Sequence, residues 1–466
     1  MINWAKVIKP YKEELLTDLD GLLRIPSVKN LKTASADAPF GTSIQEALDY
    51  ILELGKRDGF TAKDVDHYAG HLEIGQGDKL LGILSHLDVV PADPSQWKTN
   101  PFIPTIKNNR LYARGALDDK GPALLAYYAI KILKDLGVTW NQRIRLIYGT
   151  DEENDWRGVH YYFTKEEMPN YGIVPDGIFP LIYAEKGVIS IDLTKDLHSE
   201  NLVEFKSGSA YNVVPDFASA KLVYHADLEN DFSAFLEQYG LKGHFAKTED
   251  YQHLKIFGHS AHAASPSGGT NAVLHLTHFL TNLTWDESAN NFFKFINHYL
   301  FDDFTGQSFG IDFNDSKLGN VTINTAFVTI EEGKAKIGLN LRYPASYDFE
   351  IHYQKLSQVA KQHNIAATVI SHKLPSYSNI DNPETKILLE TYRKHTNDQS
   401  PPLAIGGITY SRIFERGMTF GPAFLGKPAT LHQPNEYIEL DDLFKGLEIY
   451  LDALYQIATA EGQTAD

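Results

Sequence analysis

The sequence predicts an α/β domain, with a mixed, largely parallel sheet and helices on both faces, interrupted by an inserted α+β domain. In the first part of the chain, apolar runs typical of buried strands alternate with amphipathic helical segments, an order that produces parallel sheets. Beyond about residue 186, short alternating segments separated by turn signals indicate antiparallel strands instead. We therefore expect the main domain at residues 1–186 and 380–466, and the inserted domain at residues 187–379.

The elements of the main domain follow from periodicity and from helix stop signals. We expect helices at residues 43–58 and 121–136, and buried strands at residues 79–85 and 143–150. Pro122 fits the first turn of the second helix and Gly137 follows its end. His86 comes directly after the first strand, and Asp151–Glu153 after the second. Ligands in such sheets collect at the carboxyl ends of the strands, so these side chains are candidate site residues.

The inserted domain and the end of the chain have their own elements. Alternating polarity predicts strands at residues 188–194, 218–226, 320–330 and 335–343, and helical spacing predicts helices at residues 271–283 and 351–363. After residue 383 the chain returns to helix, loop and helix, and it closes with an amphipathic helix at residues 441–460.

Composition excludes several classes of protein. The chain has 466 residues with a hydrophobic content of 43%, enough for large cores, and a formal net charge of −17 argues against binding nucleic-acid phosphates or anionic lipid. It contains no cysteine, which excludes disulfides, thiolate metal sites and cysteine nucleophiles. The start of the chain has no apolar signal core and no apolar run is long enough to span a bilayer, so a cytoplasmic protein is expected.

Five polar segments interrupt the hydrophobic pattern and could carry chemistry. They are centred on His86 with Asp88, on Asp118 with Asp119, on Asp151–Asp155, on Asp176 and on His432. Each one alone also fits an ordinary turn, a helix-capping pair, a solvated acidic loop or a surface histidine. Together they supply histidine nitrogens and carboxylate oxygens, the ligands that suit zinc or manganese.

The order of these motifs identifies a family resemblance. The chain carries, in order, SHLDVVPA, RGALDDKGP, GTDEEN, VPD, GHSAHAASP and LHQPNE. This series resembles the di-zinc aminoacylase/carboxypeptidase/dipeptidase family of metallopeptidases over essentially the whole length, and within it the bacterial peptidase V dipeptidases. The resemblance implies a zinc-peptidase-like catalytic domain in two parts, with the insertion as a lid domain.

The resemblance also implies the metal ligands and the residues beside them. One zinc ion would bind His86 and Asp176, a second would bind Glu153 and His432, and Asp118 would bridge the two. The peptide bond between Asp118 and Asp119 is expected to be cis. Cobalt or manganese could replace zinc.

Further roles follow from the same resemblance. Asp88 would orient His86, and Glu152 would be the general base and acid. From the lid domain, His262 would reach the tetrahedral oxyanion. The residues implied to bind the substrate are Arg342 and Asn212, which would hold its C-terminal carboxylate, and Gly406 and Gly407, which would lie against its backbone.

These roles imply a metallo-dipeptidase that hydrolyses small unblocked peptides as a monomer. An N-acyl amino-acid deacylase or a carboxypeptidase of the same family is the nearest alternative. A serine hydrolase built around Ser260 is a second, although Gly258-His259-Ser260-Ala261-His262 lacks the second glycine of a nucleophile elbow. A binding protein that kept the fold and lost catalysis is a third, and the complete set of implied ligands argues against it.

Overall fold

The chain forms two compact units. The computed structural model describes residues 2–208, 210–223, 228–428 and 430–463. Unit 1 comprises residues 1–183, 378–403 and 409–466, and unit 2 comprises residues 184–377 and 404–408. Unit 2 thus lies within the sequence of unit 1. Its second segment, residues 404–408, falls inside the part of the chain that the sequence assigned to the main domain.

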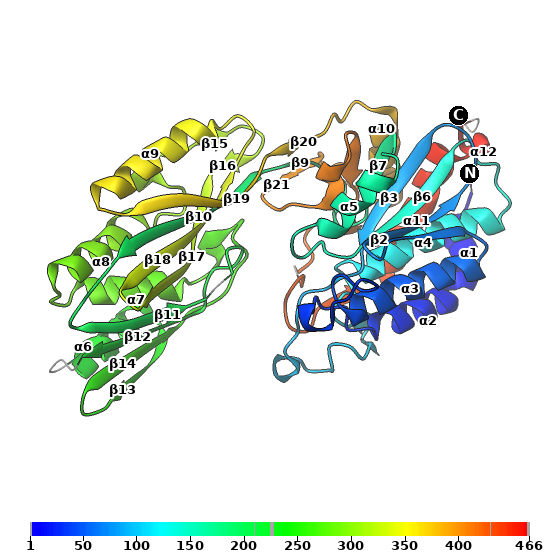
Figure 1. Ribbon diagram of the computed structural model, residues 1–466. Helices are drawn as coiled ribbons and strands as arrows, with labels where there is room; N and C mark the ends of the chain where they lie inside the picture. Colours follow the sequence, from blue (N-terminus) through cyan, green and yellow to red (C-terminus); the bar gives the residue numbers. More distant parts are fainter. Residues whose placement is uncertain (1, 209, 224–227, 429, 464–466) are drawn as a thin grey trace. The chain divides into compact units, whose positions relative to one another are not determined.

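Unit 1 is built on a mixed sheet whose strands run in the order β1, β2, β6, β3, β7 and β22 (Figure 1). Their bounds are Thr61–Val65, Ala69–Ile74, Arg143–Gly149, Leu80–His86, Tyr171–Val174 and Gly417–Thr419. The pairs β6–β3, β3–β7 and β7–β22 are parallel, whereas β1–β2 and β2–β6 are antiparallel. The strands of this parallel part are almost entirely buried, as expected for a sheet covered on both faces.

Helices cover both faces of this sheet. On β6, Leu146 and Tyr148 belong to the larger core, and Ile147 between them belongs to a smaller core that includes Val159 of helix α5. This alternation places the two cores on opposite faces. The helices of unit 1 are α1 Trp4–Ile8, α2 Lys12–Leu23, α3 Thr42–Arg57, α4 Lys120–Asp135, α5 Arg157–Lys165, α10 Pro383–Thr396, α11 Leu440–Ala458 and α12 Ala460–Gln463.

The remaining short strands lie in unit 1 or close to the unit boundaries in the sequence. They are β4 Thr105–Lys107, β5 Arg110–Tyr112 and β24 Tyr437–Glu439, which form one small sheet, β8 Gly177–Ile178 with β23 Pro422–Ala423, and β9 Ile182–Glu185, β20 Ser376–Tyr377 and β21 Leu403–Ile405 near the unit boundaries. The small sheet matters for the site, because it joins β5, just before the Asp118 loop, to β24, just after the His432 segment.

Unit 2 is an antiparallel sheet with the order β13, β14, β12, β11, β17, β18, β10 and β19, packed against helices (Figure 1). The strands are Lys242–Lys247, Tyr251–Phe257, Phe217–Val223, Leu202–Ser207, Thr322–Glu331, Lys334–Tyr343, Gly187–Asp196 and Ala366–Lys373. The helices are α6 Leu228–Tyr239, α7 Ala272–Thr281, α8 Glu287–Tyr299 and α9 Phe349–Gln362, and a short hairpin is formed by β15 Asn314–Asp315 and β16 Gly319–Asn320. All four helices contribute to one core with the sheet, which explains the alternation in β12 and β14.

The structure confirms the predicted fold class, a mixed α/β sheet with helices on both faces and an α+β insertion. Elements recognised by periodicity agree to within about two residues. The predicted strand at 218–226 corresponds to β12 as far as Val223, and residues 224–226 lie outside the described residues. No helix in the described part of the chain has the length and apolar character needed to cross a membrane.

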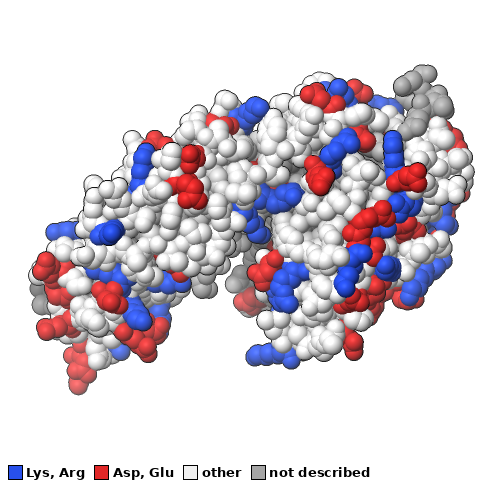
Figure 2. All heavy atoms as spheres, turned by 45° about the horizontal axis from the view of Figure 1, so that its top comes forward, with Lys and Arg blue, Asp and Glu red and all other residues white. Residues whose placement is uncertain are grey.

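The net negative charge does not gather in one place on the face that Figure 2 shows. There, acidic side chains lie among Lys and Arg side chains on each unit. The ion pairs of unit 1 give one example, in which Arg143 and Arg145 at the start of β6 face the carboxylates of Glu73 and Glu167. Mixed surface charge of this kind favours solubility rather than binding to a polyanion.

We predict that His71 contributes to acid unfolding of unit 1. It lies buried on β2 beside Tyr162, and burial together with the neighbouring Arg145 lowers its pKa to about 3. The unfolded chain therefore binds a proton at this residue below about pH 6.5 that the folded chain does not bind. The free energy of unfolding should fall by up to about 1.4 kcal/mol per pH unit between pH 6.5 and 3 from this group alone.

Urea unfolding at a series of pH values measures this effect. His71→Gln, which keeps a polar partner for Tyr162, should have a flatter dependence than the parent across that range. His160→Gln, which changes an exposed histidine of the same unit, should leave the parental slope. Equal slopes for the parent and His71→Gln would contradict the prediction.

Candidate metal centre

The candidate metal ligands lie at the carboxyl-terminal edge of the parallel strands of unit 1. β3 ends at His86, and its parallel neighbour β6 ends at Gly149, just before Asp151–Glu153. On the other side of β3, β7 ends at Val174, two residues before Asp176. Because these strands are adjacent and parallel, three segments that are distant in the sequence meet at one edge of the sheet.

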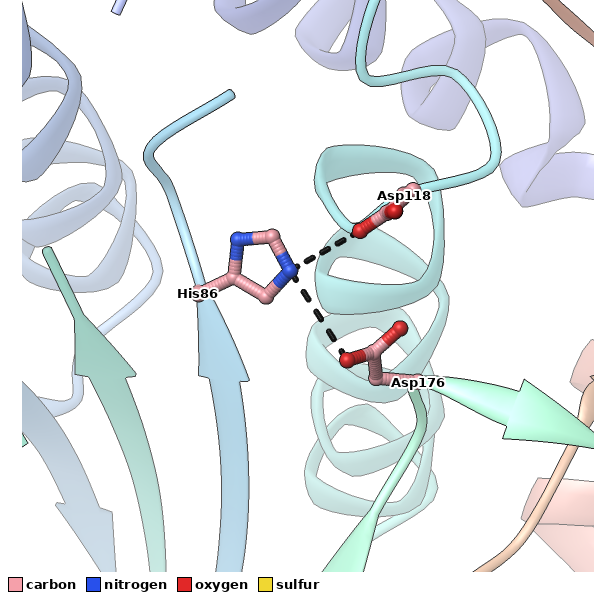
Figure 3. Close-up of side chains that lie close together, drawn as sticks. All are labelled: His86, Asp118 and Asp176. Atoms are coloured by element: carbon pink, nitrogen blue, oxygen red, sulfur yellow. Dashed lines mark hydrogen bonds and ion pairs between the residues drawn. The ribbon is translucent and has the colours of Figure 1, made fainter. Parts of the chain in front are cut away.

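The first group of ligands is His86, Asp118 and Asp176, with the imidazole pointing toward both carboxylates (Figure 3). The Nε2 atom of His86 lies 2.9 Å from Oδ1 of Asp118 and 3.8 Å from Oδ2 of Asp176. Asp118 comes from the loop before helix α4, and its peptide bond to Asp119 is cis, as expected. The three ligand atoms lie within 4.8 Å of one another, a spacing that one cation can fill.

The second group shares Asp118 with the first and adds Glu153 and His432. The Nε2 atom of His432 lies 2.9 Å from Oδ2 of Asp118 and 3.0 Å from Oε1 of Glu153. One oxygen of Asp118 therefore faces His86 and the other faces His432. Each oxygen of Asp118 would therefore be available to a different cation.

The ring of His86 is held in one tautomer by the backbone. Its Nδ1 atom lies 2.8 Å from the carbonyl oxygen of Asp88, which can only accept a hydrogen bond, so Nδ1 carries a proton. Nε2 is then either the lone-pair donor of a neutral imidazole or the second N–H of an imidazolium. Since Nε2 faces two carboxylates, a neutral ring fits this position only if a cation lies between Nε2 and the carboxylate oxygens.

Asp88 contacts His86 in a way that differs from the expectation. Its carboxylate, expected to orient the imidazole, lies 3.7 Å from Nδ1 and accepts the backbone N–H groups of Glu152 at 2.9 Å and Glu153 at 3.0 Å instead. The physical reason is that the backbone carbonyl already occupies Nδ1, while the turn after β6 presents two N–H groups that need acceptors. Asp88 thus orients the ring through its main chain and the two glutamates through its side chain.

The carboxylates at this edge of the sheet carry more negative charge than the neighbouring side chains neutralise. Burial raises the pKa of Asp176 to about 7, with a further contribution from the charge of Asp118, and burial raises the pKa of Asp88 to about 6. Burial and the neighbouring carboxylates also raise the pKa of Glu152 well above its usual value. Without a cation, these acids compensate for crowding by binding protons.

The two histidines also bind protons more tightly than usual. Burial lowers the pKa of His86, but the carboxylates of Asp118 and Asp176 outweigh it and raise the pKa well above its usual value. His432 keeps 37% of its side chain exposed, and partial burial opposes its protonation, yet Asp118 and Glu153 raise its pKa to about 11. The site therefore favours positive charge at both imidazole positions. In the absence of metal ions, protons supply this positive charge. The nitrogen and oxygen atoms at these positions are a donor set that fits divalent metal ions such as zinc.

The residues implied to bind substrate from the lid domain lie in unit 2. Arg342, on β18, is buried and donates from Nη1 to the carbonyl oxygen of Gly406 at 2.6 Å and from Nε to Oδ1 of Asn340 at 3.1 Å. The backbone N–H of Lys186 donates to the carbonyl of Ile405 at 3.0 Å. These bonds explain why residues 404–408, including Gly407, belong to unit 2.

Unit 2 also brings together the loops of Asn212 and His262. The backbone carbonyl of Asn212 accepts the N–H of Ala263 at 2.9 Å, and Val213 forms a bridge with His262. The side chain of Asn324, buried on β17, donates to the carbonyl of Val213 at 2.9 Å. The structure thus assembles the metal candidates within unit 1 and the lid candidates within unit 2.

Two carboxylates beside the centre received no role from the sequence. Oδ2 of Asp119 accepts the backbone N–H of His86 at 3.0 Å, and Oε1 of Glu436 accepts the backbone N–H of Asp118 at 3.2 Å. Both lie inside the motifs RGALDDKGP and LHQPNE, so their closeness to expected ligands was the available signal. Their partners could not be read from the sequence, because each bonds to a residue in a distant segment.

Comparison with known proteins places this geometry in context. A model of peptidase family M20/M25/M40 matches residues 82–456. A protein of Staphylococcus aureus (strain MW2) named "Putative dipeptidase" is 41% identical over 469 residues, which cover 98% of this chain and 100% of the relative. Among solved structures, human carnosine dipeptidase 1 matches with a TM-score of 0.63 and 14% identity, covering 97% of each chain. The dipeptidase Dug1p of Saccharomyces cerevisiae matches with a TM-score of 0.61 and 13% identity, also covering 97% of each chain.

Proposed function

The chain belongs to peptidase family M20/M25/M40 and is a hydrolase acting on peptide bonds, and from this premise we propose that it is a dinuclear-zinc dipeptidase that cleaves unblocked dipeptides. The observation that carries the proposal is the position of Asp118, whose two oxygens face two imidazoles that each have a second carboxylate nearby. The dipeptidase name of the Staphylococcus aureus relative supports the same substrate class.

In this proposal His86, Asp118 and Asp176 hold one zinc ion, and Asp118, Glu153 and His432 hold the other. The chemistry that such a pair of ions supplies when bound is polarisation of the scissile carbonyl and a lower pKa of the attacking water. Cobalt or manganese would be accepted by the same oxygen and nitrogen donors.

Glu152 is the residue that moves the proton in this proposal. Its carboxyl has a pKa raised well above the usual value by burial, which suits a group that must both accept and release a proton near neutral pH. The Asp88 carboxylate fixes the backbone of Glu152, so the side chain starts from a defined position. Glu152 would accept a proton from water at its carboxylate and pass it to the nitrogen of the leaving amine.

The residues of unit 2 would select the substrate. The planar guanidinium of Arg342 matches the two oxygens of a C-terminal carboxylate, with Asn212 as a second donor. His262 would donate to the oxyanion of the tetrahedral intermediate, a contact of the kind worth about 3–4 kcal/mol. Gly406 and Gly407 would lie along the substrate backbone, and the bond from Arg342 to Gly406 supports this placement. We also propose a monomer located in the cytoplasm.

Assays on a matched panel of small substrates test the function. We expect free dipeptides to be cleaved with kcat/KM at least about 10²-fold higher than dipeptides with an amidated C-terminus, because the amide lacks the negative charge and the second oxygen that the planar guanidinium of Arg342 would bind. N-acetylated amino acids and longer peptides should be equally poor substrates. Chelation followed by dialysis should abolish cleavage, and added zinc should restore it.

The alternatives give different outcomes in the same panel. Turnover of acetylated amino acids above that of free dipeptides would indicate an N-acyl amino-acid deacylase, and release of single C-terminal residues from long peptides would indicate a carboxypeptidase. Activity that survives chelation and disappears in Ser260→Ala would indicate a serine hydrolase. Each of these results would replace the proposed function.

A further inference from the structure

Glu436 lies next to the bridging candidate Asp118 without belonging to either group of ligands. Its side chain is fully buried, and its two oxygens have different partners. Oε1 accepts the backbone N–H groups of Leu117 at 2.9 Å and Asp118 at 3.2 Å, while Oε2 accepts from Nη1 of Arg114 at 2.5 Å. One carboxylate therefore binds the loop of Asp118 at three points.

Arg114 is fixed in turn. It is buried, its guanidinium lies 5.4 Å from the ring centre of Trp97, and its backbone N–H donates to the carbonyl of Pro101 at 2.8 Å. The backbone of Glu436 also takes part, because its carbonyl accepts the N–H of Ala113 at 3.2 Å. A charged pair in such surroundings keeps one geometry, since moving either partner leaves a buried charge unpaired.

This pair joins two of the three segments that supply the second group of ligands, those of Asp118 and His432. Glu436 follows His432 by four residues, and it binds the loop that ends in Asp118. The orientation of Asp118 decides whether each of its oxygens reaches a different imidazole. The backbone at Leu117 and Asp118 must therefore be fixed for the two oxygens of Asp118 to face different imidazoles.

We infer that Glu436, held by Arg114, is a positioning residue that sets Asp118 as the bridge between two metal positions and couples it to His432. The inference rests on the proposed function for the presence of the metal ions, and the hydrogen bonds that carry it are independent of them. Loss of an outer partner of a metal ligand typically weakens metal binding 10- to 100-fold. Because Asp118 serves both groups, we expect both metal positions to weaken together.

Zinc titration of metal-free protein, in competition with a chromophoric chelator, tests the inference with Glu436→Gln. We expect an apparent Kd roughly 10- to 100-fold higher than that of the parent for both ions, with two ions still bound at saturation. The absorption spectrum of the cobalt-loaded variant should also change, since it reports ligand geometry. Unchanged affinity and an unchanged cobalt spectrum in the folded variant would overturn the inference.

A matched control lies three residues further along the chain. Glu439, on β24, accepts from Arg110 at 3.0 Å and from Lys427 at 2.6 Å, and it touches neither metal group in the described residues. Glu439→Gln weakens a more exposed Arg–Glu pair, in which the side chains of Arg110 and Glu439 are 38% and 22% exposed, and zinc affinity should remain parental. A loss equal to that of Glu436→Gln would mean that any broken ion pair near β24 disturbs the site, and would overturn the specific role.

Two further measurements test the inference if the Glu436→Gln variant does not fold. The double variant Arg114→Leu/Glu436→Leu removes both buried charges, a change that is often neutral for stability, and it leaves the Leu117 and Asp118 amides without their acceptor. Zinc binding as tight as that of the parent would overturn the inference.

Hydrogen exchange in the unmodified metal-free protein is the second measurement. Exchange at the backbone amides of Leu117 and Asp118 should be slow, and exchange at the rate of exposed amides would overturn the inference as well. If the parent itself binds no zinc, the proposed function fails, and the exchange result still decides whether Glu436 fixes the loop.

Discussion

Asp118→Asn should remove zinc from both positions at once. Each Asp118 oxygen serves one imidazole, at 2.9 Å in both cases, and an amide presents only one oxygen and no negative charge. We expect zinc retained after dialysis to fall from about two ions per chain to well below one. The loss of zinc affinity should exceed the roughly 10- to 100-fold loss that follows removal of a hydrogen-bond partner of a ligand. Activity should fall about 10³-fold or more, because metal ions contribute several kcal/mol of transition-state stabilisation.

Metal analysis of the dialysed protein checks this result, with circular dichroism to show that the variant is folded. Asp155→Asn is the control, because this exposed acid lies in the Asp151–Asp155 segment that also contains Glu153, and it pairs with Lys29 at 3.2 Å rather than with the site. It should keep the parental zinc content. An Asp118→Asn variant that retains two ions would exclude a bridging role for Asp118.

The fold and the positions of the candidate ligands could be predicted where a local pattern marks the end of a strand. The apolar run before His86 and the strand before Asp151 both end in polar residues, and parallel strands bring such ends together. His86, Asp118 and His432 could be placed near one another only through the resemblance of six ordered motifs. Periodicity alone could not have joined residues that lie more than 300 positions apart.

Features that depend on long-range pairing could not be read from the sequence. The antiparallel edge formed by β1 and β2 is one case, because strand direction is decided by the partner and not by the strand itself. The pairing of Glu436 with Arg114 is another, since neither residue has a local signal for a buried charge. The Asp88 contact shows a third limit. The sequence indicated the correct neighbour of His86, but the backbone carbonyl rather than the carboxylate makes the bond.

The assignment of residues 404–408 to unit 2 has the same origin. Gly406 and Gly407 follow a strand-like segment in the C-terminal part of the sequence, and composition gives no reason to separate them from it. The separation arises because Arg342 binds the carbonyl of Gly406 and Lys186 binds the carbonyl of Ile405. A residue's membership of a unit thus follows from hydrogen bonds formed only in the folded chain.

Glu152→Gln should slow turnover strongly while leaving zinc in place. Glu152 lies beside the metal candidates but belongs to neither group of ligands, and burial raises the pKa of its carboxyl well above the usual value, which suits a group that exchanges a proton. Removing a general acid–base group typically costs about 10²–10⁴-fold in rate. We therefore expect kcat to fall within that range, with KM for a free dipeptide changed by less than about threefold, because an isosteric amide leaves substrate binding intact.

The neighbouring glutamate provides the contrast that makes this prediction specific. Glu153 lies 3.0 Å from His432, so Glu153→Gln should lose zinc from the second position, and high zinc concentration should restore part of its activity. Added zinc should not restore Glu152→Gln. Measuring kcat, KM and bound zinc for both variants separates a proton carrier from a ligand, although the two residues are adjacent in the chain. If Glu152→Gln were rescued by zinc, Glu152 would be a ligand, and proton transfer would have to be assigned to another residue.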